Sequence, residues 1–185
     1  MPSIEDPDVK LLAAIADVLQ EEYPASKDEW EGSPFFWTKT RPPRQQGAIC
    51  ERLLAGFLAA KGFAVTDAPD SEADRVVNGV RVEIKSSTLW KAGTYRFQQL
   101  RDQNYDIAIC LGLSPFNVHC WVIPKSVIMS GWGTAKGLRS QHGGQQGSDT
   151  AWLAVDPNNV QSWLWPYGGS LAEAVEVLTR ILRER

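Results

Sequence analysis

Apolar residues recur at helical spacing in three stretches of the chain. Residues 7–22, 46–61 and 171–182 each carry apolar side chains three or four positions apart, a period that predicts amphipathic helices with one face toward a core. The second stretch ends at Lys61-Gly62, and a glycine just past the last helical residue is a common stop signal. The chain is therefore expected to contain helices near its start, in its first third and at its end.

Between the second and third helices the pattern changes to short apolar or alternating runs typical of strands. The expected strands are residues 63–66, 75–77, 80–85, 106–113, 118–123 and 151–155. Residues 125–129 are predicted to form a short helical turn. Residues 24–46 contain several proline and glycine breakers and residues 131–149 are rich in Gly, Ser and Gln, so both are predicted as irregular.

This order of elements predicts an α/β fold of mixed α+β type, with a central mixed β-sheet flanked by helices. The length of 185 residues fits a single domain over residues 1–185, and 43% hydrophobic with 22% charged residues is typical of soluble globular proteins. We expect no membrane span and no secretory signal, and hence a cytoplasmic protein. The three cysteines lie among apolar neighbours and are predicted to be reduced core thiols.

Charge is unevenly distributed along the chain, although the net charge is only −3. Residues 1–31 hold nine acidic and two basic residues, whereas residues 75–101 hold six basic residues and one acidic residue. A basic middle suits a protein whose central face meets phosphate, but the same pattern could simply solvate a surface.

The pair Asn78-Gly79 lies between two strand-like runs, which is a strong signal for a two-residue hairpin turn. Counting outward from this turn places Asp74 opposite Glu83, with their side chains on one face about 5 Å apart. Like charges in that arrangement repel, and one divalent cation shared by the two carboxylates would resolve the repulsion. Strand alternation puts Lys85 on the same face as Glu83.

Two carboxylates, a cation and an amine suit the hydrolysis of phosphodiester bonds. The metal polarises a phosphoryl oxygen and lowers the pKa of a bound water. The amine of Lys85 can steer or deprotonate that water, or balance negative charge on the reacting phosphate. The residues alone leave these roles open.

Asp74, eight intervening residues and Glu83-Ile84-Lys85 resemble the core of the PD-(D/E)xK nuclease superfamily, the restriction-endonuclease-like enzymes. The resemblance covers about residues 47–124, with the helix at 7–22 and residues 125–185 as additions. It implies a Mg²⁺-dependent DNA endonuclease of restriction, mobile-element or phage type, in which Mn²⁺ can replace Mg²⁺. The sequence departs from the motif at Ala73, where the family has proline, and a literal Pro69-Asp70 lies upstream; we prefer Asp74 because Asp70 lies beyond the hairpin register.

The resemblance also implies supporting residues. An acid on the first core helix often completes the metal site, and Glu51 matches it; Ile84 is assigned to the same metal set, with Asp74 and Glu83. A glutamine after the lysine strand often supports the site. Gln99 is the nearest match, and Gln98 and Gln103 are alternatives.

Several polar residues are candidates for DNA contact. Arg41 and Arg44 precede the second helix and could clamp phosphate near its N-terminus or belong to a solvated loop. Lys91, Arg96 and Arg101 are candidates for contacts with the DNA backbone. His142 lies in a Gly-rich stretch that is either a recognition loop or a flexible connection. His119 is predicted to be a structural partner rather than a ligand.

Eight tryptophans are many for this length. Most are predicted to cover the sheet as core, while stacking on extruded bases or a homodimer contact are alternatives. No Gly-rich phosphate loop is present, so a nucleotide cofactor is not expected. Two other functions stay open: a DNA-binding module of the same fold that has lost its chemistry, and a structural or interaction protein that uses its Trp-rich ends.

Overall fold

The computed structural model describes residues 6–22, 28–141 and 149–184. Within these ranges the helices are α1 (Pro7–Glu22), α2 (Phe36–Lys39), α3 (Pro43–Ala60), α4 (Lys125–Gly131), the 3₁₀ helix η1 (Ser162–Tyr167) and α5 (Leu171–Arg183). The strands are β1 (Val65–Asp67), β2 (Arg75–Val77), β3 (Val80–Thr88), β4 (Tyr95–Leu100), β5 (Ile107–Leu113), β6 (Val118–Pro124), β7 (Leu138–Ser140), β8 (Ala151–Val155) and β9 (Gly168–Ser170). No helix in the described ranges is both long and apolar enough to cross a bilayer.

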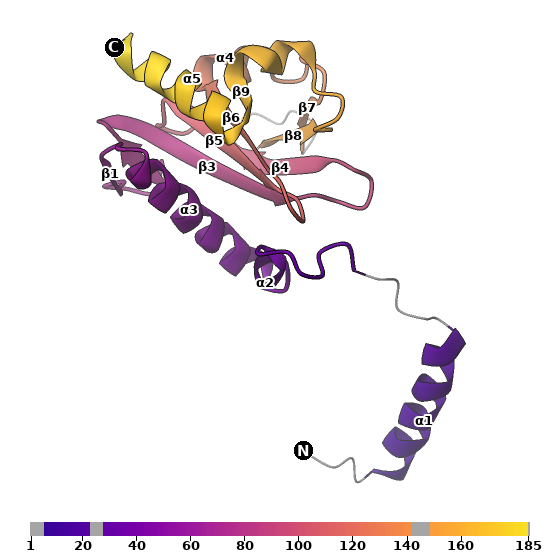
Figure 1. The fold of residues 1–185 in the computed structure, drawn as a ribbon. Helices are drawn as coiled ribbons and strands as arrows, with labels where there is room; N and C mark the ends of the chain where they lie inside the picture. Colours follow the sequence, from indigo (N-terminus) through magenta and orange to yellow (C-terminus); the bar gives the residue numbers. More distant parts are fainter. Residues whose placement is uncertain (1–5, 23–27, 142–148, 185) are drawn as a thin grey trace.

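The main sheet has six strands in the order β1-β2-β3-β5-β6-β9. Strands β3 and β5 pair in parallel, and the other neighbouring strands pair antiparallel. A mixed α+β fold with helices beside a mixed sheet was predicted from the sequence, and the structure confirms it (Figure 1). The predicted hairpin register is also confirmed, since Arg75 pairs with Val82 and Val77 with Val80.

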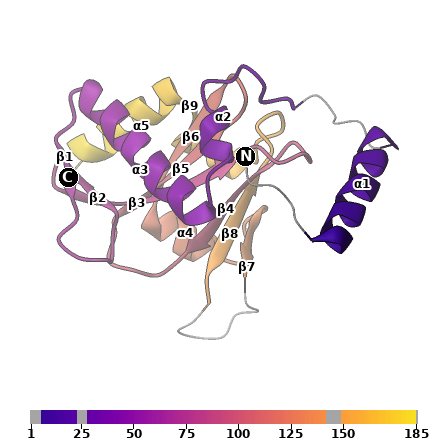
Figure 2. The same cartoon turned by 90° about the horizontal axis from the view of Figure 1, so that it is seen from below.

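Two apolar layers cover the two faces of the main sheet. Helices α3 and α5 pack on one face, where Leu54 and Leu178 meet alternate residues of β3, β5 and β6 such as Val82. The opposite face packs against a second, three-stranded sheet in the order β4-β8-β7, together with α4 and η1. Strands β4, β8 and β7 lie side by side in Figure 2. The sequence predicted only one sheet, so the second sheet is a correction.

The N-terminal half of the chain shows how proline can start a helix rather than break one. Residues 24–46 were predicted as irregular and the second helix as residues 46–61. The helix instead begins at Pro43, with Pro42 as its N-cap, and the short α2 precedes it. Proline suits the first helical position because its missing N–H has no intrahelical acceptor there.

Two further predictions were wrong in detail. Residues 131–149 were predicted as a loop, but β7 lies within them. Residues 95–101 were not assigned a strand, although β4 occupies most of that stretch. A β-bulge between Phe97 and Leu100 breaks the strand's alternation, and Gln99 there has a φ of 59°. In such a bulge two residues face one residue of the partner strand, so the sequence no longer alternates between buried and exposed positions and the strand is hard to predict.

Candidate active site

The site forms where one strand of the hairpin ends before the other. The β2–β3 ladder stops at the pair Arg75–Val82. On the β2 side, residues 83–88 of β3 therefore have no strand partner in the described part of the chain. The side chains of Glu83 and Lys85 lie along this stretch of β3, on the face opposite Val82 and Ile84. The end of β2 thus leaves an open strand edge beside two charged groups.

Asp74 lies at a bend one residue before β2, rather than continuing the ladder as the sequence had suggested. Its backbone N–H donates to the carbonyl of Val82 at 2.9 Å. Its carboxylate oxygen Oδ2 accepts a hydrogen bond from the backbone N–H of Ile84 at 2.7 Å. The Asp74 side chain therefore replaces the missing strand partner at the open edge of β3.

Glu83 and Lys85 form a close ion pair, with Lys85 Nζ 2.5 Å from Glu83 Oε1. The Glu83 residue is only 5% exposed. Burial raises the pKa of the Glu83 carboxyl above its ordinary value, while the Lys85 ammonium offsets part of that rise and Asp74 adds to it. A buried carboxylate is costly unless its charge is paired, and Lys85 provides the opposite charge here.

Glu51 reaches the same region from the opposite side, because α3 crosses the sheet face that bears Val82. Burial and the nearby Asp74 carboxylate both raise the pKa of the Glu51 carboxyl. Arg75, on β2, lies between Glu51 and Asp67. Its Nη2 is 4.0 Å from Glu51 Oε2, and its Nη1 is 3.4 Å from Asp67 Oδ1. Glu51 is thus close enough to Asp74 and Glu83 for their charges to affect its carboxyl, and Arg75 is a neighbour that the sequence analysis missed.

Strand β4 runs beside β3 on the side of the second sheet. The backbone N–H of Arg96 donates to Ser87 Oγ at 2.9 Å. Arg101, just after β4, is close enough to Glu83 to lower the pKa of its carboxyl. Gln99 and its rival Gln98 are both exposed on this strand. Among these predicted residues, Arg101 is the one whose charge acts on a carboxyl of the site, that of Glu83.

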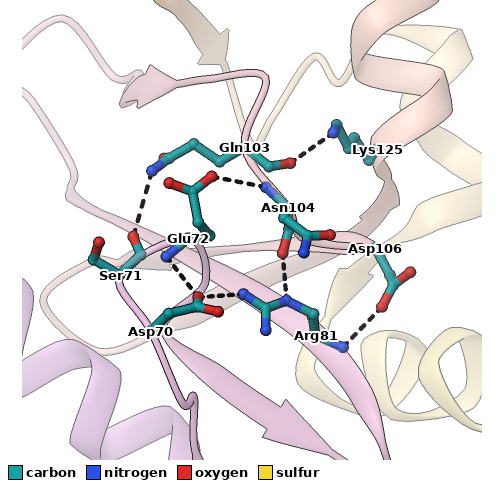
Figure 3. Close-up of polar contacts among 8 residues, drawn as sticks. All are labelled: Asp70, Ser71, Glu72, Arg81, Gln103, Asn104, Asp106 and Lys125. Atoms are coloured by element: carbon teal, nitrogen blue, oxygen red, sulfur yellow. Dashed lines mark hydrogen bonds and ion pairs between the residues drawn. The ribbon is translucent and has the colours of Figure 1, made fainter.

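A separate polar network fixes the loops that lead into the site (Figure 3). The carboxylate of Asp70 accepts from the Arg81 guanidinium and from the backbone N–H of Glu72. Arg81 also donates to the carbonyl of Asn104, and the backbone N–H of Asn104 donates to Glu72 Oε2 at 3.2 Å. The loop before Asp74 is thereby tied to the turn before β5, and Asp70 is engaged there.

The remaining candidates for DNA contact are dispersed. Arg41 and Arg44 are exposed at the start of α3, and Lys91 is exposed between β3 and β4. The Arg96 guanidinium lies 4.2 Å from the ring centroid of Trp90 and 5.4 Å from that of Trp152. His142 lies outside the described residues.

Three predictions about other residues can be compared with the structure. The described cysteines are all buried and unpaired, as expected. His119 Nδ1 is 2.8 Å from the Tyr95 hydroxyl, which confirms a structural partner. The prediction that most tryptophans are core residues is only partly correct. Trp30 and Trp121 are buried, whereas Trp37, Trp90 and Trp165 are exposed.

The donor atoms at the site suit a hard cation in type but are not gathered around one point. Carboxylates and main-chain carbonyls are the ligands that Mg²⁺ prefers, and Glu51, Asp74 and Glu83 supply three such carboxylates. In the described residues, however, no group of three His, Cys, Asp or Glu side chains already forms a ligand set. Binding a cation would require Glu83 to exchange its ion pair with Lys85.

Comparison with known proteins gives a likeness in fold. No protein family matches the sequence, and no curated protein is similar enough to count as a relative. Among solved structures, a bacterial homing endonuclease, I-Ssp6803I, is similar over 77% of this chain and 95% of its own chain, with a TM-score of 0.51 and 17% sequence identity. At that identity the likeness concerns the fold. This chain therefore shares its mixed α/β architecture with that protein.

Proposed function

We propose that this chain is a Mg²⁺-dependent DNA endonuclease whose central groups are Asp74, Glu83 and Lys85. The observation that carries the proposal is the buried ion pair of Glu83 and Lys85 at an open strand edge, next to the Asp74 carboxylate. Two nearby carboxylates repel each other, and a divalent cation shared between them would relieve that repulsion. The fold likeness to a protein titled a homing endonuclease supports the same reading and favours a mobile-element type.

The residues that would hold the ion are Asp74 and Glu83, with Glu51 and the main-chain carbonyl of Ile84 in support. When bound, Mg²⁺ would polarise the scissile phosphate and make a bound water more acidic. The raised pKa values of Glu51 and Glu83 fit this assignment, because a nearby cation would favour their ionised forms.

The chain's own cations would act on the negatively charged substrate. If Glu83 turned toward an ion, Lys85 Nζ would lose its partner and could donate hydrogen bonds to a phosphate oxygen. Arg75 and Arg101 flank the same carboxylates and would hold the DNA backbone beside them. Positioning and electrostatic stabilisation of this kind supply much of the catalysis in phosphoryl transfer.

The test is a cleavage assay with near-isosteric variants. Purified protein is incubated with supercoiled plasmid, linear duplex and single-stranded DNA, with Mg²⁺, with Mn²⁺ or with EDTA. We expect nicking or cutting with either metal, and a loss of at least about 100-fold in Asp74→Asn, Glu83→Gln and Lys85→Met. Asp74→Asn keeps an oxygen that can accept from the Ile84 N–H, so the lost activity would not reflect a lost hydrogen bond.

Two variants distant from the site serve as matched controls. Glu176→Gln on α5 and Lys61→Met at the end of α3 remove one exposed charge each and should cut as the parent does. Equal cutting by the parent and all three site variants would reject the assignment. Metal-independent DNA binding without turnover would instead identify an inactive binding module. A homodimer stays a prediction, since cutting both strands generally needs two active centres.

A further inference from the structure

The outward face of the three-stranded sheet has a composition that the candidate site does not explain. Residues of β4, β8 and β7 alternate between buried and accessible positions. Tyr95, Phe97 and Leu153 point into the core, so Arg96, Trp152 and Arg139 point outward. The three strands contain no acidic residue. The sheet thus presents arginine and tryptophan on one side without carboxylates between them.

Cross-strand pairing gathers these side chains. Arg139 on β7 is the register partner of Trp152 on β8, and Arg96 on β4 is the partner of Ala154 on β8. The Arg96 guanidinium lies over both the Trp152 ring and the Trp90 ring, and Trp90 is 44% exposed. The basic and aromatic groups therefore form one continuous patch, which we call the outer-sheet patch: Trp90, Arg96, Arg139 and Trp152.

The Arg96 guanidinium is held over two aromatic rings, and neither arginine of the patch forms an ion pair with a carboxylate of the described residues. Stacking on aromatic rings uses the flat faces of a guanidinium and leaves its N–H edges available. Among the described residues, no carboxylate or carbonyl accepts a hydrogen bond from the Arg96 or Arg139 side chain in this structure. The acid nearest to Arg139 in the sequence, Asp149, accepts hydrogen bonds from Ser140 and from the backbone N–H of Thr150. An arginine fixed in this way is preorganised for a phosphate group.

We propose that the outer-sheet patch is a docking surface for duplex DNA. The proposal rests on the proposed endonuclease function and extends it. Arg101 directly follows β4 and lies near Glu83, so a duplex on the patch would be held next to the site.

The dimensions of the sheet favour B-form DNA over other nucleic acids. The paired strands β7 and β8, which carry Arg139 and Trp152, lie about 4.8 Å apart and form a two-stranded ribbon within the sheet. The major groove of B-DNA is about 12 Å wide and admits a two-stranded β-ribbon, whereas the major groove of A-form RNA is deep and narrow. Single-stranded DNA would instead bind through base stacking on Trp90 and Trp152.

The experiment measures binding of the full chain to a 30-base-pair DNA duplex by fluorescence anisotropy in EDTA, at several salt concentrations. Arg139→Gln and Arg96→Gln are each expected to raise Kd about 5- to 10-fold and to reduce the slope of log K against log salt by about 1. Arg183→Gln, which removes an exposed arginine from α5, is the matched control and should change Kd less than twofold. Circular dichroism and thermal melting verify that each variant is folded.

The outcomes separate this inference from the nuclease proposal. Parental Kd and salt slope in both patch variants would overturn the docking surface, as would tighter binding of single-stranded DNA or duplex RNA than of duplex DNA. If the parent protein never cuts DNA but the patch variants bind it more weakly than the parent does, the docking surface is supported and the endonuclease proposal is rejected. If the parent cuts DNA in Mg²⁺ and both patch variants bind and cut as well as the parent, the endonuclease proposal is supported and the docking surface is rejected.

Discussion

At the scale of single residues, the hydroxyl of Tyr105 is an exception to the general pairing of buried polar groups. Tyr105 is 3% exposed, and its hydroxyl has no hydrogen-bond partner in the part of the chain described. Burial, and secondarily the nearby Glu83 carboxylate, raise the pKa of this phenol. The group is therefore a neutral, desolvated hydroxyl close to the candidate site.

Tyr105→Phe is expected to stabilise the protein. Removing a buried hydroxyl that makes no hydrogen bond should increase the free energy of unfolding by about 1 kcal/mol, because the desolvation cost disappears. The measurement is chemical denaturation monitored by tryptophan fluorescence.

Tyr95→Phe is the matched control, since the Tyr95 hydroxyl is bonded to His119 and its removal should lower stability by a similar amount. If Tyr105→Phe also lowers stability, its hydroxyl must have a partner, such as a buried water.

At the scale of elements, local signals predicted the centre of the fold. The Asn78-Gly79 turn sets the register of β2 and β3 because both residues adopt positive φ, 47° and 83°, as a tight hairpin turn requires. That register brings Glu83 and Lys85 onto one face and Asp74 near them. The proximity of Asp74, Glu83 and Lys85 follows from a two-residue turn and strand alternation, so it could be predicted from the sequence.

Elements defined by distant partners could not be read in the same way. Strand β4 is formed by pairing with β8, which lies more than 50 residues later in the chain. Its β-bulge interrupts the alternation of buried and exposed side chains by which a strand is recognised in a sequence. Arg75 joins Glu51 only because α3 packs across the β2 end of the sheet. The outer-sheet patch depends on the pairing of β8 with β4 and with β7, which explains why Arg139 had no signal in the sequence.

The network of Figure 3 gives a prediction about pH. The Arg81 guanidinium, and then the Glu72 N–H, lower the pKa of the Asp70 carboxyl below its ordinary value of 3.8. A depressed pKa in the folded state means that ionised Asp70 favours folding. This contribution is present above pH 3.8 and is lost as pH falls through the lower folded value.

Asp70→Asn should therefore melt at a lower temperature than the parent at pH 7, and the difference should shrink below about pH 3.8. Melting curves from pH 3 to pH 7 measure it. Glu176→Gln, which changes an exposed helix carboxylate, should show no such convergence. A gap between Asp70→Asn and the parent that stays constant with pH would contradict an electrostatic role for this network.

At the scale of the whole molecule, α1 stands apart from the rest. In Figures 1 and 2 it lies away from the two sheets, and its apolar residues Leu11, Leu12, Ile15 and Val18 are exposed. An isolated helix of 16 residues is marginal in water. Among the side chains of α1 whose burial is described, none belongs to either apolar layer of the sheet, so the stability of the folded body should not depend on this helix.

A chain that lacks residues 1–27 is accordingly expected to melt within about 2 °C of the parent, because the described side chains of α1 add no buried apolar contact to the core. Leu54→Ala provides the contrast: Leu54 is 2% exposed in the layer under α3, and its truncation should cost about 2–5 kcal/mol. Differential scanning calorimetry at two protein concentrations measures both. A fall of about 5 °C or more on deletion would mean that α1 buries its apolar face in solution. If the melting temperature of the parent also rose with concentration, that face would be buried against a second copy of the chain.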